Sequence, residues 1–233
     1  IQNNKSNEMK DELKNINLLI DEFNKIAFIA QRKAFITIAS EIQKEEIETI
    51  EAYRNSLFEL KRKYVEHELN EEANLTFCLE QSLQSIQYEL QMLINIKEDN
   101  MNEAWNNLVK AQVTYESVAR NCPYESISAN GYMRKLEYYE KILFPGMMFA
   151  SIGGIIKKSH CSICNESYNK CNHIKGKLYN GEMCVRMVTE MELEEVSLVD
   201  IPANKQCRVL TTTYNGKTVD SLTLREIEKT NDE

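Results

Sequence analysis

The segment LEQSLQSIQYELQML, residues 79–93, carries the pattern that decides the fold of the first half of the chain. Its apolar residues are separated by alternating steps of four and three, and this spacing places them along one face of a helix. They are Leu79, Leu83, Ile86, Leu90 and Leu93. The same spacing continues from Met101 to Val118, after one extra four-residue step at Lys97, and an equivalent seam runs from Met9 to Ala34. Such seams are typical of coiled coils and of long antiparallel helix pairs.

Glycine and proline are absent from the first 122 residues of the 233-residue chain. These residues are the strongest helix breakers, so residues 1–122 are predicted to form one long helical region, either a coiled coil or a helix hairpin. Two polar stretches, HELNEEAN (67–74) and NIKEDNMNE (95–103), are the places where such a rod could turn back. Pro123 ends the region, because proline cannot donate to a continuing helix.

The remaining sequence has a different character. Residues 123–147 are predicted to form a linker with a short helix from 132 to 143. Residues 148–233 are predicted to form a small α+β domain, with a β-hairpin turn at Asn215-Gly216 and a short helix at 224–229. Its β-rich runs are RMVTEM (186–191), EEVSLVDI (194–201), CRVLTTTY (207–214) and KTVDSLTL (217–224). The predicted fold class is mainly α followed by α+β.

Charge and cysteine content narrow the classes of function. The net charge is -8, and an acidic helical region argues against a nucleic-acid partner. No apolar run approaches the roughly 18 residues that a membrane span needs, so no membrane partner is expected. Seven cysteines, five of them between Cys161 and Cys207, indicate metal-bound thiolates in a reducing compartment. The cytoplasm is therefore the expected location.

The stretch HCSICNESYNKCNHIKG, residues 160–176, predicts a metal site. Cys161 and Cys164 have the spacing of a two-thiolate knuckle, and Cys171 with His173 supplies a second pair of ligands seven residues later. Four such ligands suit tetrahedral Zn²⁺ and leave no open position, so a structural ion that staples the small domain is expected. Cys184 is a fifth candidate, which could replace either member of the second pair.

Two further segments, FASIGG (149–154) and LEEVSLVDIPANKQCRV (193–209), flank this cluster. Together they resemble the C-terminal part of the tailed-phage prohead (capsid maturation) serine protease family, over residues 143–210. Some members of that family carry a similar Cys/His insertion. The resemblance implies that Ser151 matches the nucleophile and that the gene has a phage or prophage origin. The family supplies a base from a histidine upstream of the serine, whereas the upstream histidine in this chain, His67, falls in the helical region.

Two hypotheses about function follow. The first is a non-catalytic assembly or interaction protein that binds a protein partner, or itself, through its helical seams, as a homo-oligomer or as a subunit of a larger assembly. A defence or regulatory adaptor that recognises a phage assembly component gives the same sequence signals. The second is a serine protease of phage capsid maturation, with Ser151 as nucleophile and the helical region as a scaffold-binding arm. Both place the protein in the cytoplasm of a bacterial host.

Overall fold

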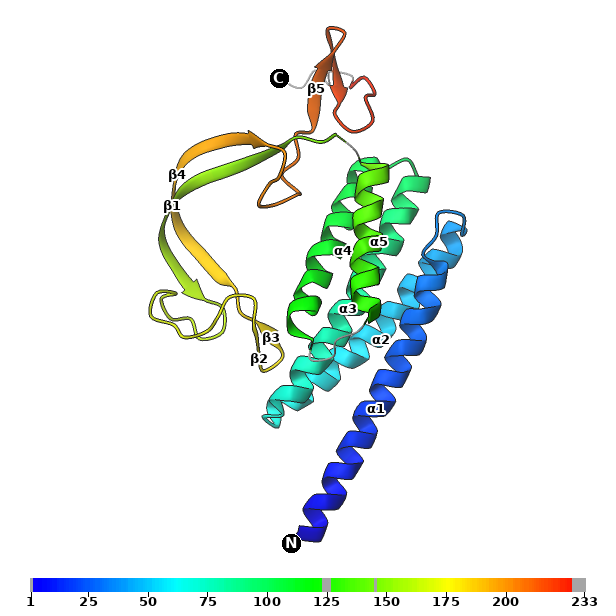
Figure 1. Ribbon diagram of the computed structural model, residues 1–233, viewed down its shortest axis with the longest axis vertical. Coiled ribbons are helices and arrows are strands. Elements are labelled where there is room, and N and C mark those ends of the chain that lie inside the picture. The colour runs from blue at the N-terminus through cyan, green and yellow to red at the C-terminus, as the bar shows by residue number, and fades with distance from the viewer. Residues whose placement is uncertain (1, 123–126, 145, 228–233) are drawn as a thin grey trace.

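The computed structural model describes the backbone of residues 2–122, 127–144 and 146–227, and the side chains of 16–122, 131–144 and 146–227. Five helices precede all the strands in this part of the chain, which confirms the predicted fold class (Figure 1). The helices are α1 (Gln2–Lys33), α2 (Ser40–Glu66), α3 (Asn70–Lys97), α4 (Met101–Asn121) and α5 (Ile127–Leu143). The strands are β1 (Phe149–Cys161), β2 (Leu178–Tyr179), β3 (Glu182–Met183), β4 (Arg186–Val199), β5 (Thr211–Tyr214) and β6 (Lys217–Asp220).

Helix α3 forms the centre of the helical bundle. Its seam residues Leu83, Leu90 and Leu93 are buried, and α1, α2 and α4 all contact this helix. Both polar stretches are turns, centred on Glu68 and Asp99, which adopt positive φ angles of 58° and 60°. The helices therefore fold back on one another, and the described part of the seams is covered largely within the chain. Of the two predicted helical forms, the structure has the helix hairpin.

A third turn, between α1 and α2, had no signal in the sequence because it contains neither glycine nor proline. It is stabilised by side chains from other helices. The buried Gln43 amide donates to the carbonyl oxygens of Lys33 at 2.8 Å and Phe35 at 3.0 Å. The ammonium group of Lys97, from α3, donates to the carbonyl of Ile38 at 2.7 Å. Local backbone bonds such as Phe35 N–H to Lys33 are thus supplemented by side-chain donors that satisfy the remaining carbonyls of the turn.

Helix α5 starts at Ile127, five residues earlier than predicted, and packs on α4. Leu136 is fully buried, and the ring of Tyr132 meets that of Tyr115 edge to face at 4.6 Å. Lys135 pairs with the carboxylate of Glu89, which is buried in α3, at 2.5 Å. An ionised carboxylate at such a depth needs a partner of this kind. Helix α5 therefore completes the bundle.

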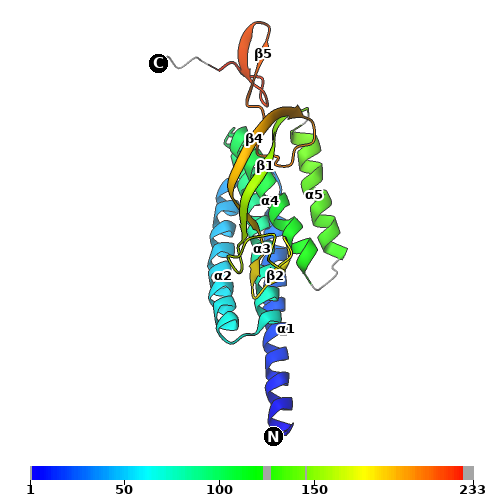
Figure 2. The ribbon, with the colours of Figure 1, turned by 90° about the vertical axis from the view of Figure 1, so that its left-hand side faces the viewer.

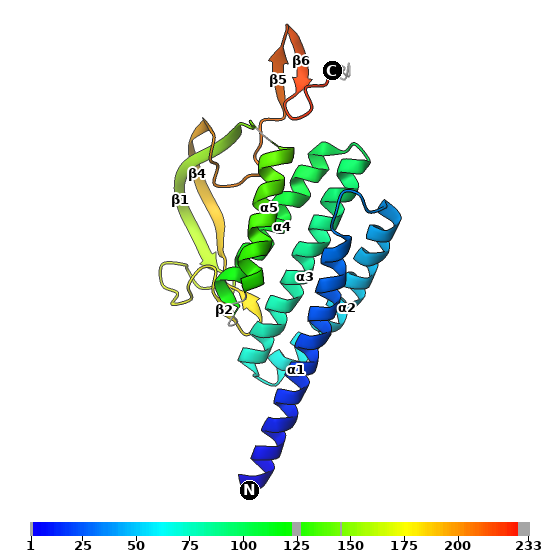
Figure 3. The ribbon, with the colours of Figure 1, turned by 45° about the vertical axis from the view of Figure 1, so that its right-hand side comes forward.

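Strands β1 and β4 form a long antiparallel two-stranded ribbon, from Phe149 opposite Val199 to Cys161 opposite Arg186. We call this the β1–β4 ribbon. It bows away from the bundle, and the short β2–β3 hairpin lies at its far end (Figures 1 and 3). Strands β5 and β6 form a separate hairpin. The described strands thus make three small sheets of two strands each.

The predicted hairpin turn at Asn215-Gly216 is confirmed, with positive φ angles at both residues. The predicted helix at 224–229 is wrong over residues 224–227. Leu224 has a φ of 56°, and Glu226 forms an isolated β-bridge with Val219, because this segment folds back along β6. Residues 228 and 229 lie outside the described residues. The predicted boundary after 122 falls at the end of α4, and that after 147 falls between α5 and β1; the division into separate domains stays a prediction.

The β1–β4 ribbon is attached to the bundle at both of its ends. At one end the Trp105 indole of α4 donates to the carbonyl of Lys205 at 3.0 Å and packs on the rings of Phe144 and Phe149. At the other end Asn121, at the last turn of α4, donates to the carbonyl of Gly176 at 2.8 Å. Trp105 and Asn121 are sixteen positions apart, which corresponds to about 24 Å of helix. The ribbon therefore spans most of the length of α4 (Figure 1).

The β2–β3 hairpin makes a further contact with the start of α3. The amide of Asn180 donates to the side chain of Asn70 at 2.6 Å, and the amide of Gly181 donates to that of Asn74 at 2.8 Å. Gly181 has a φ of 75°, and a Cβ there would lie 3.3 Å from the Ala73 side chain, so the turn requires glycine. No helix in the described part of the chain has the length and apolar content that crossing a membrane requires.

Candidate metal centre

The first pair of candidate ligands lies where β1 ends. Cys161 is the last residue of β1, and the chain then makes a tight turn in which the amide of Asn165 donates to the carbonyl of Cys161 at 2.9 Å. Asn165 adopts a φ of 60°, a conformation that asparagine tolerates better than most residues. The amide of Ile163 donates to the Cys161 sulfur at 3.3 Å. This turn brings Cys164 back toward Cys161.

The second pair comes from the loop between β1 and β2. The backbone amide of His173 donates to the Cys171 sulfur at 3.1 Å, and the His173 Nδ1 lies 3.2 Å from the same sulfur. The His173 ring stands edge-on to the ring of Tyr179 in β2, with the centroids 4.5 Å apart. The Tyr179 hydroxyl also accepts a hydrogen bond from the amide of Ile174 at 2.9 Å. Tyr179 thus fixes the loop that carries His173.

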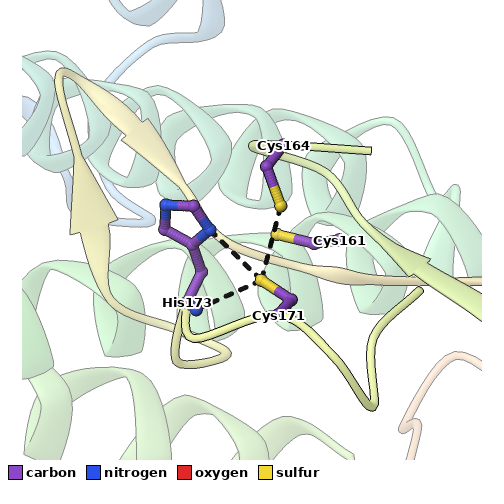
Figure 4. A group of neighbouring side chains, drawn as sticks. All are labelled: Cys161, Cys164, Cys171 and His173. Carbon is purple, nitrogen blue, oxygen red and sulfur yellow. Dashed lines mark hydrogen bonds between the residues drawn. The ribbon is translucent and has the colours of Figure 1, made fainter. Parts of the chain in front are cut away.

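The structure brings all four predicted ligands together. The three sulfurs and one ring nitrogen of Cys161, Cys164, Cys171 and His173 lie within 4.8 Å of one another, and we call these residues the Cys/His cluster. Figure 4 shows their side chains converging, with the Cys164 and Cys171 sulfurs 3.4 Å apart. Zinc–sulfur bonds of about 2.3 Å in a tetrahedron separate two sulfurs by about 3.8 Å. The cluster therefore has the donors and nearly the spacing to hold a metal ion.

Cys184, the fifth candidate, lies on the buried side of the cluster. Its sulfur is 3.7 Å from that of Cys161, and both residues are fully buried. It is outside the set of four whose ligand atoms are all mutually close. Its backbone bonds to the loop before β2, because its amide donates to Lys177 and its carbonyl accepts from Gly176. Cys184 therefore packs beside the cluster and also ties the loop to the start of β4.

The environment distinguishes the thiols electrostatically. Burial raises the pKa of Cys161. Hydrogen bonds from the amides of Cys164 and Ile163 lower it by more than burial raises it, and the resulting pKa is about 6. Burial raises the pKa of Cys171 to about 11, and burial next to Cys161 also raises that of Cys184. Metals bind thiolates, so Cys161 is the residue best prepared to receive a cation. Proximity to that cation would favour ionisation of the remaining ligands.

Ser151 lies in the β1–β4 ribbon, opposite Ser197 and far along the strand from the Cys/His cluster. Among the described residues, no histidine forms a hydrogen bond with its hydroxyl. His160 is nine residues further along β1, which corresponds to about 30 Å of extended strand. The Nδ1 of His67 bonds the carbonyl of Lys63 within α2, and His173 belongs to the Cys/His cluster. The role of Ser151 as a nucleophile stays a prediction.

Sequence reasoning missed the residues that hold the site against the bundle. The contact of Trp105 with Lys205 has no local signal in the sequence, because the two residues are 100 positions apart. Asn70 and Asn74 were placed in a turn. Their spacing of four at the start of a helix puts both side-chain amides on one face. This spacing is the signal in the sequence that both could contact the same segment.

Comparison with known proteins gives no relative. No protein-family model, curated protein or solved structure matches the chain. The resemblance to prohead proteases therefore depends on the short segments at 149–154 and 193–209 alone.

Proposed function

We propose that this chain is a non-catalytic assembly or interaction protein, in which the helical bundle presents the β1–β4 ribbon to a protein partner. One observation carries the proposal. The ribbon is attached to the bundle at both ends, yet large apolar side chains between those ends are exposed to solvent. Exposed apolar surface of this extent is typical of interaction sites.

The metal in this proposal is Zn²⁺, held by the Cys/His cluster in a structural role. Three thiolates and an imidazole suit Zn²⁺, and four protein ligands leave no position for water or substrate. The ion would join the end of β1 to the loop that precedes the β2–β3 hairpin. That hairpin contacts Asn70 and Asn74 of α3, so the ion would fix one of the two attachments of the ribbon.

In this proposal, association through the helices involves fewer residues than the apolar seams of the sequence indicated. Seam residues such as Leu83 and Leu90 are buried within the chain and offer nothing to a partner. Exposed apolar side chains remain on α1, including Leu18 and Phe28. The backbone of α1 also extends well beyond the other helices (Figure 2). Helix α1 is therefore a second surface for a partner, with the ribbon as the first.

The placement of the histidines favours binding over proteolysis. A serine hydroxyl needs a general base within hydrogen-bond reach, and Ser151 lies in the ribbon about 30 Å of strand from His160. The resemblance of the flanking segments to prohead proteases supports a phage or prophage origin, and thus assembly in the cytoplasm of a bacterial host. The reduced thiols that the metal requires agree with that compartment.

Site-directed photo-crosslinking in host cells tests this function. A photo-reactive amino acid in place of Leu193, an exposed residue of β4, is expected to yield a crosslinked protein adduct. The matched control places the same group at Glu51, an exposed residue of α2, and is expected to yield none. Equal adduct formation at both positions, or none at Leu193, would contradict the proposal.

A further inference from the structure

The β1–β4 ribbon leaves both strand edges and much apolar surface uncovered. The cross-strand partners Ile152 and Val196 are 63% and 62% exposed, and Leu198 is 65% exposed. An isolated two-stranded ribbon is at best marginally stable in water, and unpaired edges are templates for another strand. The middle of the ribbon therefore has the features of a surface that a further strand completes.

The uncovered part of the β1 edge has definite limits. At one end the amide of Ala150 donates to Cys207, and at the other the carbonyl of Ser159 accepts from Tyr168. Residues 151–158 between them have no further strand alongside within the described chain, and they span about 26 Å. Figure 2 shows the ribbon in front of the bundle, with β1 and β4 side by side, so that the open edges face sideways and not into the helices.

Charge distinguishes the two strands. Strand β1 carries Lys157 and Lys158, whereas β4 carries four carboxylates at Glu190, Glu192, Glu194 and Glu195. Within the chain, Lys157 pairs with Glu192 at 2.7 Å, and Lys158 pairs with Glu190. A strand that adds to the edge of β4 must therefore bring basic and apolar residues. Two β4 edges paired antiparallel would bring these carboxylates close to one another, which is destabilising.

We infer that the strand added to β4 is β1 of a second copy of this chain, paired antiparallel in the register that joins β1 and β4 within one chain. The inference rests on the proposed function and names its partner. In an antiparallel pair, opposite residues that share no backbone hydrogen bond direct their N–H and C=O groups to the outer edges of the two strands. The same residue pairs can therefore meet again between copies, with Lys158 opposite Glu190 and Ile152 opposite Val196.

This contact is heterologous, because the β1 edge of one copy meets the β4 edge of the next. Such contacts generate rings when the rotation between copies closes, and open chains when it does not. Each inner copy would have both ribbon edges paired, so the assembly would grow beyond a dimer. The bundle would remain outside the shared sheet, since the attachments to the ribbon that the described residues show lie at its two ends.

A charge-swapped variant tests the inference, with assembly measured by sedimentation velocity on the metal-loaded full chain. Wild-type protein should form oligomers larger than dimers as concentration rises. The variant K157E/K158E/E190K/E192K reverses both intrachain ion pairs and should assemble with itself. A tagged wild-type chain should not capture it, because the mixed edges bring like charges together. The far-ultraviolet circular dichroism and the bound metal content of the variant should match those of wild type.

An apolar variant gives an independent measurement. I152T/V196T keeps strand-forming residues but removes apolar area from the ribbon, so its oligomers should dissociate at concentrations where wild type assembles. The matched control is I142T on α5, at a residue that is also exposed, and it should assemble as wild type does. A wild-type chain that stays monomeric, or that co-assembles freely with the charge-swapped variant, would overturn the inference. If Leu193 still crosslinked to another protein in that case, the proposed function would stand.

Discussion

The indole nitrogen of Trp105 donates a hydrogen bond to the backbone carbonyl of Lys205 at 3.0 Å, across 100 residues of sequence. The same indole packs on Phe144 and Phe149, which lie at the end of α5 and the start of β1. Lys205 in turn pairs through its ammonium with Glu140 of α5 at 2.6 Å. One side chain thus fixes the loop after β4, the start of β1 and the end of α5 against the bundle.

Replacing Trp105 with Phe should loosen this attachment without emptying the core. The partly buried carbonyl of Lys205 would lose its donor while most of the aromatic packing remained, and the loss of one hydrogen bond typically costs about 0.5–1.5 kcal/mol. Urea denaturation should show a loss of stability in this range, and amide exchange should accelerate in residues 200–209. The control is Tyr138→Phe on the exposed face of α5, which should change neither. Unchanged exchange in Trp105→Phe would show that packing alone holds the loop.

Metal removal should affect the two halves of the chain differently. Folding of small zinc-stapled regions is coupled to metal binding, whereas the helical bundle has its own apolar core. Chelation at neutral pH should therefore abolish amide protection at 161–185 and free the β2–β3 hairpin from α3. The circular dichroism signal of the helices should largely persist. Full protection of 161–185 in metal-free protein would contradict a structural role for the ion.

Cysteine variants should separate the ligands from the neighbouring thiol. Cys164 belongs to the Cys/His cluster, and Cys184 lies beside it. Cobalt-loaded Cys184→Ser should keep the thiolate-to-metal charge-transfer intensity of wild type, and Cys164→Ser should lose a share of it. The two serine variants change the same atom type and serve as controls for each other. The opposite result would make Cys184 a ligand in place of Cys164.

Alkaline pH should destabilise the bundle through its tyrosines. Burial raises the pKa of Tyr53 to about 12, above the usual value of 10.0, and its hydroxyl donates to the carbonyl of Leu19. Between these two values the unfolded chain binds fewer protons than the folded one, so the stability present below pH 10 should fall as pH rises toward 12. Stability curves of wild type and Tyr53→Phe measured across this range should converge. Parallel curves would exclude a contribution from Tyr53.

Ser151 should not react with a fluorophosphonate probe. A general base typically contributes about 10² to 10⁴ in rate, and no histidine is bonded to this hydroxyl among the described residues. Intact-mass measurement after incubation should therefore show unmodified protein, as it should for Ser151→Ala. Stoichiometric labelling of wild type that disappears in Ser151→Ala would promote the protease hypothesis. His160→Ala would then show whether that histidine assists.

The sequence alone determined the features that depend on neighbours close in the chain. The four-three spacing of Leu79 to Leu93 fixed a helix and its buried face, since a helix repeats every 3.6 residues. Asn215-Gly216 fixed a hairpin, because both residues accept positive φ. The short spacings of Cys161, Cys164, Cys171 and His173 sufficed to bring four ligands together. Each of these depends on backbone geometry within about fifteen residues or fewer.

Only the tertiary structure decided the features that join distant segments. The turn between α1 and α2 depends on Gln43 and Lys97, and the attachment of the β1–β4 ribbon depends on Trp105 and Asn121. No pattern along the chain indicates such pairs, because a hydrogen-bond donor satisfies any acceptor that packing brings within about 3 Å. The middle of β1 and β4 lies outside the core because the helices cover one another's apolar faces, a tertiary arrangement that the strand sequences do not indicate.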